Sequence, residues 1–162
     1  MTTNKYDVPF VISTSVIEGQ GAFASRDIMT GQFVGVYDGD VLTDEEAWMR
    51  TQLDPSLQTT MFSLGNGFMV DGSRNNCGTF RINHGCDPNV FCQLYESGSV
   101  RWIVMYACRD IKKDEELLYD YALEVPLGEE LTNYRCFCGS SKCYGTMSAN
   151  LAIRLMSSRL HL

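Results

Sequence analysis

Short apolar runs rich in β-branched and aromatic residues alternate with turn residues along most of this chain. Six such runs predict β-strands, at residues 8–17, 32–37, 61–64, 68–71, 90–95 and 100–107. Asn66 and Gly67 separate two of the runs, and because both residues tolerate a positive φ they predict a tight hairpin. Residues 96–99, Glu-Ser-Gly-Ser, predict a second hairpin turn. The pattern therefore predicts a mostly β domain built from small sheets.

Two segments carry helical signals instead. Thr43 can cap a helix, and Glu46 three positions later completes a capping box. This helix should end near Asp54, because Pro55 disfavours the α conformation at the residue before it. A second helix is expected over residues 148–160, where an apolar stripe fits a core or dimer face.

The composition is that of one globular domain: 162 residues, 44% of them hydrophobic and 20% charged. The net charge of −7 does not suit the wrapping of nucleic acid, so we expect no direct nucleic-acid binding, but it permits a basic partner such as a lysine-rich peptide. The polar N-terminus lacks the apolar core of a secretory signal, and no apolar run is long enough to span a membrane. We therefore expect an intracellular protein with no membrane partner and no stable disulfides.

Three cysteines lie close together near the C-terminus. Cys136, Cys138 and Cys143 follow a C-x-C-x4-C pattern, and Gly139 allows the sharp bend that would turn them to one ion. Thiolates at this spacing indicate a zinc site, which needs a fourth ligand from elsewhere. The candidates for that ligand are Cys77, Cys86, Cys92, Cys108, His84 and His161. The alternative is a group of three buried free thiols.

Other polar and glycine-rich segments gain meaning only in combination. Residues 81–90, Arg-Ile-Asn-His-Gly-Cys-Asp-Pro-Asn-Val, offer many hydrogen-bonding groups but alone fit a turn-rich loop. Gly19 and Gly21 would let a ligand approach the backbone closely, although a lone G-x-G is weak evidence. Three tyrosines could line one cavity, two of them on the same face of an extended segment: Tyr37, Tyr119 and Tyr121.

Taken in order, four stretches resemble the SET-domain family of protein lysine methyltransferases. The stretches are residues 19–43, 81–90 (RINHGCDPNV), 107–121 (ACRDIKKDEELLYDY) and 136–147 (CFCGSSKCYGTM). The last of them resembles the family's post-SET zinc segment. The resemblance implies a fold of several small curved β-sheets with few helices and a knot-like threading of the C-terminal part. It divides the chain into a SET domain (1–125), a post-SET segment (126–147) and a C-terminal helix (148–162).

The resemblance also implies two cofactors, S-adenosylmethionine and zinc, and assigns residues to them. Contacts to S-adenosylmethionine fall on Gly19, Gln20, Gly21, Asn83, His84 and Phe137. The implied catalytic residues are three tyrosines that surround the reacting groups: Tyr121, Tyr119 and Tyr37. The implied zinc ligands are Cys86, Cys136, Cys138 and Cys143, so that Cys86 becomes the fourth ligand.

The implied reaction is methylation of a lysine in a basic protein or peptide, with a histone tail as the expected substrate. Tyr119 stands at a position that affects how many methyl groups are added, and a tyrosine there favours mono- or dimethylation. The location implied is nuclear in a eukaryote and host-directed in a pathogen. The helix expected over 148–162 could join two copies as a homodimer.

Two places depart from the family's pattern. Thr60 stands where many relatives have tyrosine, and Phe80 and Arg81 have the order opposite to the usual one. Both places lie near the cofactor in the family. The alternative function is therefore a catalytically inactive, zinc-stabilised binding module with a SET-like fold.

Overall fold

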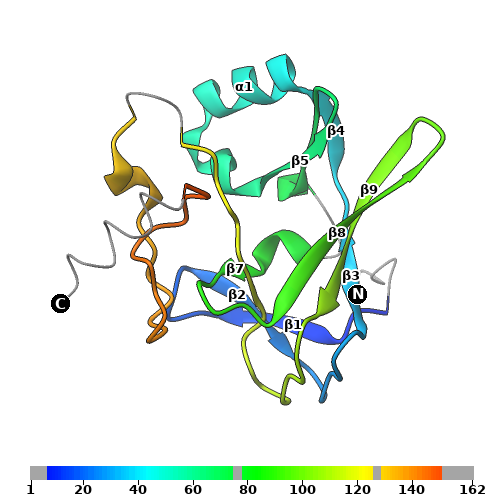
Figure 1. Cartoon of the computed structure of the whole chain (residues 1–162), viewed down its shortest axis with the longest axis vertical. Coiled ribbons are helices and arrows are strands. Elements are labelled where there is room, and N and C mark those ends of the chain that lie inside the picture. Colours follow the sequence, from blue (N-terminus) through cyan, green and yellow to red (C-terminus); the bar gives the residue numbers. More distant parts are fainter. Residues whose placement is uncertain (1–6, 75–77, 126–128, 151–162) are drawn as a thin grey trace.

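Strands dominate the chain in the computed structural model, which describes residues 7–74, 78–125 and 129–150 (Figure 1). The strands of these ranges are β1 (Phe10–Thr14), β2 (Gln20–Ala24), β3 (Phe33–Tyr37), β4 (Asp40–Thr43), β5 (Met61–Gly65), β6 (Phe68–Asp71), β7 (Asn83–His84), β8 (Val90–Ser97), β9 (Val100–Ala107) and β10 (Leu118–Tyr119). The helices are α1 (Asp44–Leu53) and the short 3-10 turns η1 (Pro55–Thr60), η2 (Gly72–Arg74), η3 (Thr79–Arg81) and η4 (Leu131–Tyr134).

The strands form four small sheets rather than one large one. Antiparallel pairing joins β1 with β2, orders the second sheet as β3-β9-β8, and orders the third as β4-β6-β5. The fourth sheet is the parallel pair β7 and β10. Figure 1 shows the β8–β9 hairpin extending away from the other sheets, with α1 beside β4 and β5. The expected fold class, several small sheets with few helices, is confirmed.

The helix predicted from the capping box is α1, and its start is confirmed at the atomic level. Thr43 Oγ1 accepts a hydrogen bond from the N–H of Glu46 at 3.3 Å, while the N–H of Thr43 donates to Glu46 Oε2 at 2.8 Å. The helix ends at Leu53, and the N–H of Asp54 closes its last turn on the carbonyl of Arg50. The two hydrogen bonds between Thr43 and Glu46 satisfy two backbone donors at the start of the helix.

Both predicted hairpins are also confirmed. Asn66 and Gly67 join β5 to β6 with φ values of 54° and 82°, and Gly98 lies at the turn between β8 and β9. The strand predicted over 8–17 is shorter, since β1 covers Phe10–Thr14. The chain turns directly after β1, where the N–H of Ser15 donates to the carbonyl of Gly19.

The C-terminal part of the chain returns through segments that are far apart in sequence. β10 runs parallel to β7, and the N–H of Gly85 donates to the carbonyl of Tyr119. Leu123 then forms a parallel bridge with Ser148. The helix expected over 148–160 therefore does not begin at Ser148, because the backbone there is extended against Leu123. Residues 151–162 lie outside the described residues, as does the dimer face expected on them.

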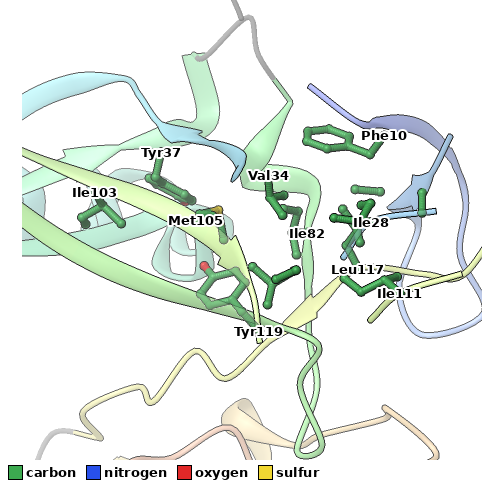
Figure 2. Packing of buried hydrophobic residues seen from close by; sticks show 14 of the residues in the cluster. Phe10, Ile28, Val34, Tyr37, Ile82, Ile103, Met105, Ile111, Leu117 and Tyr119 are labelled. Atoms are coloured by element: carbon green, nitrogen blue, oxygen red, sulfur yellow. The ribbon is translucent and has the colours of Figure 1, made fainter. Parts of the chain in front are cut away.

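One hydrophobic core connects the sheets (Figure 2). Its fully buried members include Val34 of β3, Ile82 before β7, Met105 of β9 and Leu117 before β10. Tyr37 and Tyr119 belong to the same cluster, with exposed fractions of 2% and 5%. The core thus fixes the positions of two tyrosines that the sequence indicated as functional.

Candidate active site

Tyr121 lies between two cavities of very different size. A groove of about 910 Å³ lies on one side of it, and a cavity of about 20 Å³ lies on the other. Among the described residues that line these spaces, Tyr121 is the one that lines both. It follows β10, whose parallel pairing with β7 places this residue. A group bound in the groove and a group bound in the small cavity would therefore meet at Tyr121.

The groove is formed by α1, β5 and β8 together with the segment that follows β10. Its volume falls within the range of about 300–1,000 Å³ that is usual for ligand sites. Trp48, Phe62 and Phe91 contribute apolar surface to it. Its carboxylates are Asp44, Asp120 and Glu124, and no described lining residue is Lys, Arg or His. The groove therefore suits a ligand that carries positive charge.

A series of aromatic rings leads from the core to the small cavity. Tyr37 meets Phe62 edge to face at a centroid distance of 5.2 Å, and Phe62 stacks on Tyr119 at 5.9 Å. Tyr119 lies 4.7 Å from Tyr121, and the imidazole of His84 meets Tyr121 edge to face at 5.4 Å. The three tyrosines expected to surround the reacting groups are thus brought together. Their rings exclude water from the end of the groove.

The three tyrosines are neutral phenols at physiological pH. Burial raises the pKa of Tyr37, of Tyr119 and of Tyr121 above the ordinary tyrosine value. The hydroxyl of Tyr37 donates to the carbonyl of Thr60 at 2.8 Å, and that of Tyr121 donates to the carbonyl of Ile82 at 3.0 Å. Each of these two hydroxyls has used its one hydrogen on the backbone, so its oxygen remains available to accept a hydrogen bond from an amine.

The small cavity lies between the turn before β2 and residues 135–137, here called the C-terminal strip. Glu18, Asn83, His84 and Phe137 are among the residues that line it. About 20 Å³ is room for about one water molecule. A ligand of the size of S-adenosylmethionine therefore enters only if side chains that line the cavity, such as that of Phe137, move outward. The side chain of Phe137 is 59% exposed and is therefore free to turn, whereas Cys136 beside it is buried.

The predicted cofactor residues at the start of β2 are held against Asn83. Gly19 has a φ of 42°, a left-handed conformation that favours glycine. The side-chain amide of Asn83 donates from Nδ2 to the carbonyls of Gln20 at 3.2 Å and Glu18 at 3.4 Å. Ile17 and Glu18 line the small cavity together with Asn83 and His84 of β7. The predicted cofactor residues Gly19, Gln20 and Gly21 lie beside it and do not line it.

His84 contacts two functional elements at once. Its Nδ1 accepts the backbone N–H of Tyr121 at 3.1 Å, so in the neutral ring the proton resides on Nε2. Nε2 lies 3.4 Å from the Sγ of Cys86 and can donate to it. His84 therefore connects the cysteine cluster to the backbone of Tyr121, in the way that outer groups orient metal ligands.

The four predicted metal ligands converge. The Sγ atoms of Cys86, Cys136, Cys138 and Cys143 all lie within 4.8 Å of one another. Cys86 Sγ is 3.7 Å from that of Cys136 and 3.9 Å from that of Cys143. A tetrahedron of Zn–S bonds of about 2.3 Å has edges of about 3.8 Å. The cluster therefore has the size and the soft donor set that zinc requires.

Backbone amides support three of these four sulfurs. The N–H groups of Cys138, Tyr144 and Gly145 point at the sulfurs of Cys136, Cys86 and Cys143, at 3.4, 3.4 and 3.3 Å. Hydrogen bonds from Cys136 and then from His84 lower the pKa of Cys86, so this sulfur is the favoured thiolate.

Most other candidates for the fourth metal ligand lie elsewhere. Cys92 lines the groove, and Cys108 donates to the carbonyl of Pro88. His84 touches the cluster only through Cys86. Cys77 and His161 lie outside the described residues.

The two departures from the family's pattern do not enter the small cavity. Thr60 contributes its backbone carbonyl to Tyr37, while its hydroxyl donates to the carbonyl of Leu57 at 3.0 Å. Arg81 is exposed, and its guanidinium packs 4.6 Å above the ring of Phe80. Arg81 is therefore accommodated at the surface, while Phe80 is partly buried and packs against the core.

Two residues of the site were not predicted from the sequence. Glu116 accepts a hydrogen bond from Asn83 Nδ2 at 2.9 Å, although it stands in a charged run that is typical of a solvated face. Tyr134 is buried beside the groove, where its hydroxyl donates to Glu129 Oε2 at 2.9 Å. The contact of Glu116 with Asn83 joins segments that are distant in sequence, and Tyr134 lies in an irregular segment. Hydrophobic periodicity therefore indicated neither residue.

The family model of the SET domain matches residues 19–122. The chain therefore belongs to the SET-domain family. It is 30% identical over 148 residues to the H3 lysine-4 specific histone-lysine N-methyltransferase of Saccharomyces cerevisiae, which covers 90% of this chain and 14% of that protein. Identity to human histone-lysine N-methyltransferase 2B is 32% over 133 residues, or 80% of this chain and 5% of that protein. The chain thus spans only a small part of these relatives.

Solved structures show the same fold. A humanized mutant of the Chaetomium thermophilum Polycomb Repressive Complex 2, bound to the inhibitor GSK126, matches with a TM-score of 0.64 and 30% identity over 72% of this chain and 15% of that one. The ctPRC2 complex in an autoinhibited conformation bound to S-adenosylmethionine matches with a TM-score of 0.64 and 29% identity over the same shares. Within the described ranges, no helix combines the length and apolar character needed to cross a membrane.

Proposed function

We propose that this chain is a protein lysine N-methyltransferase that uses S-adenosylmethionine and acts on a histone tail. The observation that carries the proposal is the position of Tyr121, which lines both the groove and the small cavity. A substrate side chain and a cofactor approaching from these two sides would meet at one tyrosine. The histone-lysine methyltransferase relatives and the S-adenosylmethionine-bound structural neighbour support the same reading.

The residues of the small cavity suit S-adenosylmethionine in chemistry. Asn83 offers polar contacts, Glu18 offers a negative charge, and Phe137 offers an aromatic face that could cover the adenine. When bound, the cofactor would supply a methyl group on a positively charged sulfur. Because the cavity is small, the exposed side chain of Phe137 must turn outward to admit the cofactor, while Cys136 stays in the cysteine cluster.

The groove can prepare a lysine for reaction without a strong base. A free lysine has a pKa of about 10.4, but removal of water and a neighbouring positive charge both favour the neutral amine. Phe62, Tyr119 and Tyr121 form aromatic walls at the end of the groove, which exclude water and hold the alkyl stem. The Tyr121 oxygen, with its hydrogen donated to Ile82, can accept an N–H of the amine and orient its lone pair.

The groove's charge supports a basic substrate. Asp44 of α1 and Glu124 beyond β10 both line the groove, and with Asp120 they present three carboxylates. Histone tails carry several basic residues near their lysines, so their charge is complementary to this surface. A nuclear location in a eukaryote, or delivery to host chromatin by a pathogen, would follow from this substrate.

The tyrosine at position 119 supports mono- or dimethylation. Tyr119 is 5% exposed and lies between Phe62 and Tyr121, so its hydroxyl competes for space at the closed end of the groove. Extra methyl groups on the amine would meet this hydroxyl. The proposed zinc ion would clamp Cys136, Cys138 and Cys143 to Cys86 and thereby hold the C-terminal segment over the cofactor.

The alternative, an inactive binding module, rests on Thr60 and on the order of Phe80 and Arg81. It is the weaker proposal because none of these three residues lines the small cavity. Calorimetry with S-adenosylmethionine separates the two, since tight binding contradicts a lost cofactor site.

The test of the enzymatic proposal uses labelled S-adenosylmethionine and core histones. The native chain should label a histone, and Tyr121→Phe should reduce the rate about 100-fold or more, because orientation of the amine is lost. Tyr106→Phe, a change on the β9 strand outside the groove lining, is the matched control and should keep full activity. If the native chain and Tyr121→Phe label histones at the same rate, Tyr121 takes no part in the mechanism. If the native chain labels no histone, the proposed substrate is rejected.

A further inference from the structure

A half-buried carboxylate lies directly behind the small cavity. Glu116 Oε1 accepts a hydrogen bond from Asn83 Nδ2 at 2.9 Å. The position of Glu116 is fixed by its backbone, because its residue bridges with Phe23 and the next N–H donates to the carbonyl of Ala22. Glu116 does not itself line the cavity. Any effect it has on a ligand there is transmitted by Asn83 or by its charge.

Gly21 makes this arrangement possible. A Cβ atom on Gly21 would overlap Glu116 Oε1, so any larger residue at that position would displace the carboxylate. The need for glycine here concerns space rather than backbone conformation, since Gly21 does not have a positive φ. Gly21 therefore leaves room for the carboxylate of Glu116, in addition to permitting a ligand to approach the backbone closely.

Glu116 also sets the orientation of the Asn83 amide. Nδ2 of Asn83 faces three acceptors, which are Glu116 Oε1 and the carbonyls of Glu18 and Gln20. The reversed amide would place an oxygen against these three oxygens, which is unfavourable. The carbonyl Oδ1 of Asn83 is consequently the atom left for a ligand, and a carbonyl oxygen accepts hydrogen bonds from cationic donors.

The negative charge near Tyr121 is not neutralised by an ion pair within the described part of the chain. The salt bridges among residues 7–74, 78–125 and 129–150 include neither Glu18 nor Glu116. Burial and then the charges of these two carboxylates raise the pKa of the Tyr121 hydroxyl. A field that disfavours a negative oxygen at this place favours a positive group beside it. Arg135 is the cation that lines the cavity, and its guanidinium lies over the Phe137 ring on the C-terminal strip.

We infer that Glu116, assisted by Glu18, is a positioning residue that makes the cofactor cavity prefer the sulfonium S-adenosylmethionine over the neutral thioether that remains after methyl transfer. The inference rests on the proposed function. The two ligands share their adenosine and amino-acid groups and differ in one methyl group and one positive charge. A fixed negative charge near Tyr121 therefore distinguishes them, and loss of the charge on sulfur would favour release of the spent cofactor.

The test measures the dissociation constants of S-adenosylmethionine and S-adenosylhomocysteine for the same variants. Glu116→Gln keeps the shape and an oxygen that can accept from Asn83, but removes the charge. The variant should raise the dissociation constant of S-adenosylmethionine about three- to tenfold and leave that of S-adenosylhomocysteine nearly unchanged. Glu18→Gln, at an exposed position that lines the cavity, should shift the ratio of the two dissociation constants in the same direction. Glu45→Gln, exposed on α1, has the same change in net charge and should not shift it.

The outcomes separate the inference from the proposed function. Parallel weakening of both ligands in Glu116→Gln would indicate a merely structural role and overturn the inference, as would an unchanged ratio. If Glu116→Gln does not fold, Glu18→Gln decides in the same way through its own ratio. Absence of any S-adenosylmethionine binding by the native chain would instead reject the proposed function.

Discussion

The imidazole of His84 accepts the backbone N–H of Tyr121 at 3.1 Å and turns its other nitrogen toward Cys86. Because Cys86 belongs to the four-cysteine cluster, a metal ion bound there would fix the ring of His84. The ring in turn holds the backbone of the tyrosine that lines both cavities. Metal binding and the geometry of the proposed reaction centre are therefore coupled through one side chain.

We predict one zinc ion per chain, bound by the four cysteines. Cys138→Ser should lose or strongly weaken it, since serine replaces a soft ligand by a hard one. Elemental analysis after dialysis measures the zinc content directly. Cys108→Ser is the matched control, because Cys108 is exposed and lies outside the cluster. Well-folded native protein without zinc would contradict the prediction.

Removal of the metal should loosen Tyr121 without unfolding the core. In chelator-treated protein, the backbone amide of Tyr121 should exchange its hydrogen faster, because His84 loses its fixed thiolate partner. Amides of β9 such as that of Met105 lie in the core and should keep their protection. Exchange mass spectrometry compares the two segments in one sample. Equal protection of Tyr121 with and without metal would show that the coupling through His84 is not effective.

The elements that the sequence predicted well are those with a local cause. The capping box of Thr43 and Glu46 and the hairpin of Asn66 and Gly67 depend on residues that are neighbours in sequence, so their signals could be read directly. The pairing of β7 with β10 could not, since each strand has two residues and they lie more than 30 positions apart. The contact of Glu116 with Asn83 depends on that pairing.

The cysteine cluster and the tyrosines illustrate a different limit. Spacing indicated a metal site at Cys136, Cys138 and Cys143, but left the fourth ligand open among distant residues. Cys86 was assigned through the resemblance alone, and in the structure its Sγ lies 3.7 Å from that of Cys136. The roles of these residues in catalysis and metal binding remain predictions.

Tyr119→Phe should raise the degree of methylation. The change removes a hydroxyl at the closed end of the groove and retains the ring that stacks on Phe62 at 5.9 Å. The space gained can hold a further methyl group, so the products should shift from mono- and dimethyl toward trimethyl lysine. Mass spectrometry of a methylated histone peptide reads the distribution. An unchanged distribution would show that this hydroxyl does not limit the reaction.

Arg50→Ala should destabilise the fold, more at neutral than at acidic pH. Arg50 Nη1 lies 2.9 Å from Asp71 Oδ2 and 3.1 Å from Asp40 Oδ2, and the Asp71 side chain is 1% exposed. Loss of the Arg50 guanidinium leaves the buried Asp71 carboxylate without this partner, which lowers the free energy of unfolding by about 1–3 kcal/mol. Denaturation by urea at pH 7 measures the loss. Arg26→Ala, which breaks an exposed pair, should change the midpoint little.

The pH dependence follows from the pKa of Asp71. Burial alone would raise this pKa, but hydrogen bonds from Ser73 and from Arg50 outweigh burial and hold it below the ordinary value. The charged carboxylate therefore stabilises the fold above its unfolded-state pKa, and that stabilisation is lost as the pH falls through the folded-state pKa. The difference between native chain and Arg50→Ala should narrow as the pH falls toward 3. A constant difference from pH 7 to pH 3 would contradict this assignment.

The most direct test of the central claim is a crystal structure with S-adenosylhomocysteine and a lysine-containing histone peptide bound together. We predict that the thioether sulfur lies on the Asn83 side of Tyr121 and the lysine amine on the groove side, with both close to the Tyr121 hydroxyl. The side chain of Phe137 should have turned to cover the adenosine, with Cys136 still in the cysteine cluster. A cofactor bound away from Asn83, or a lysine that enters elsewhere while Tyr121 faces bulk solvent, would contradict the account.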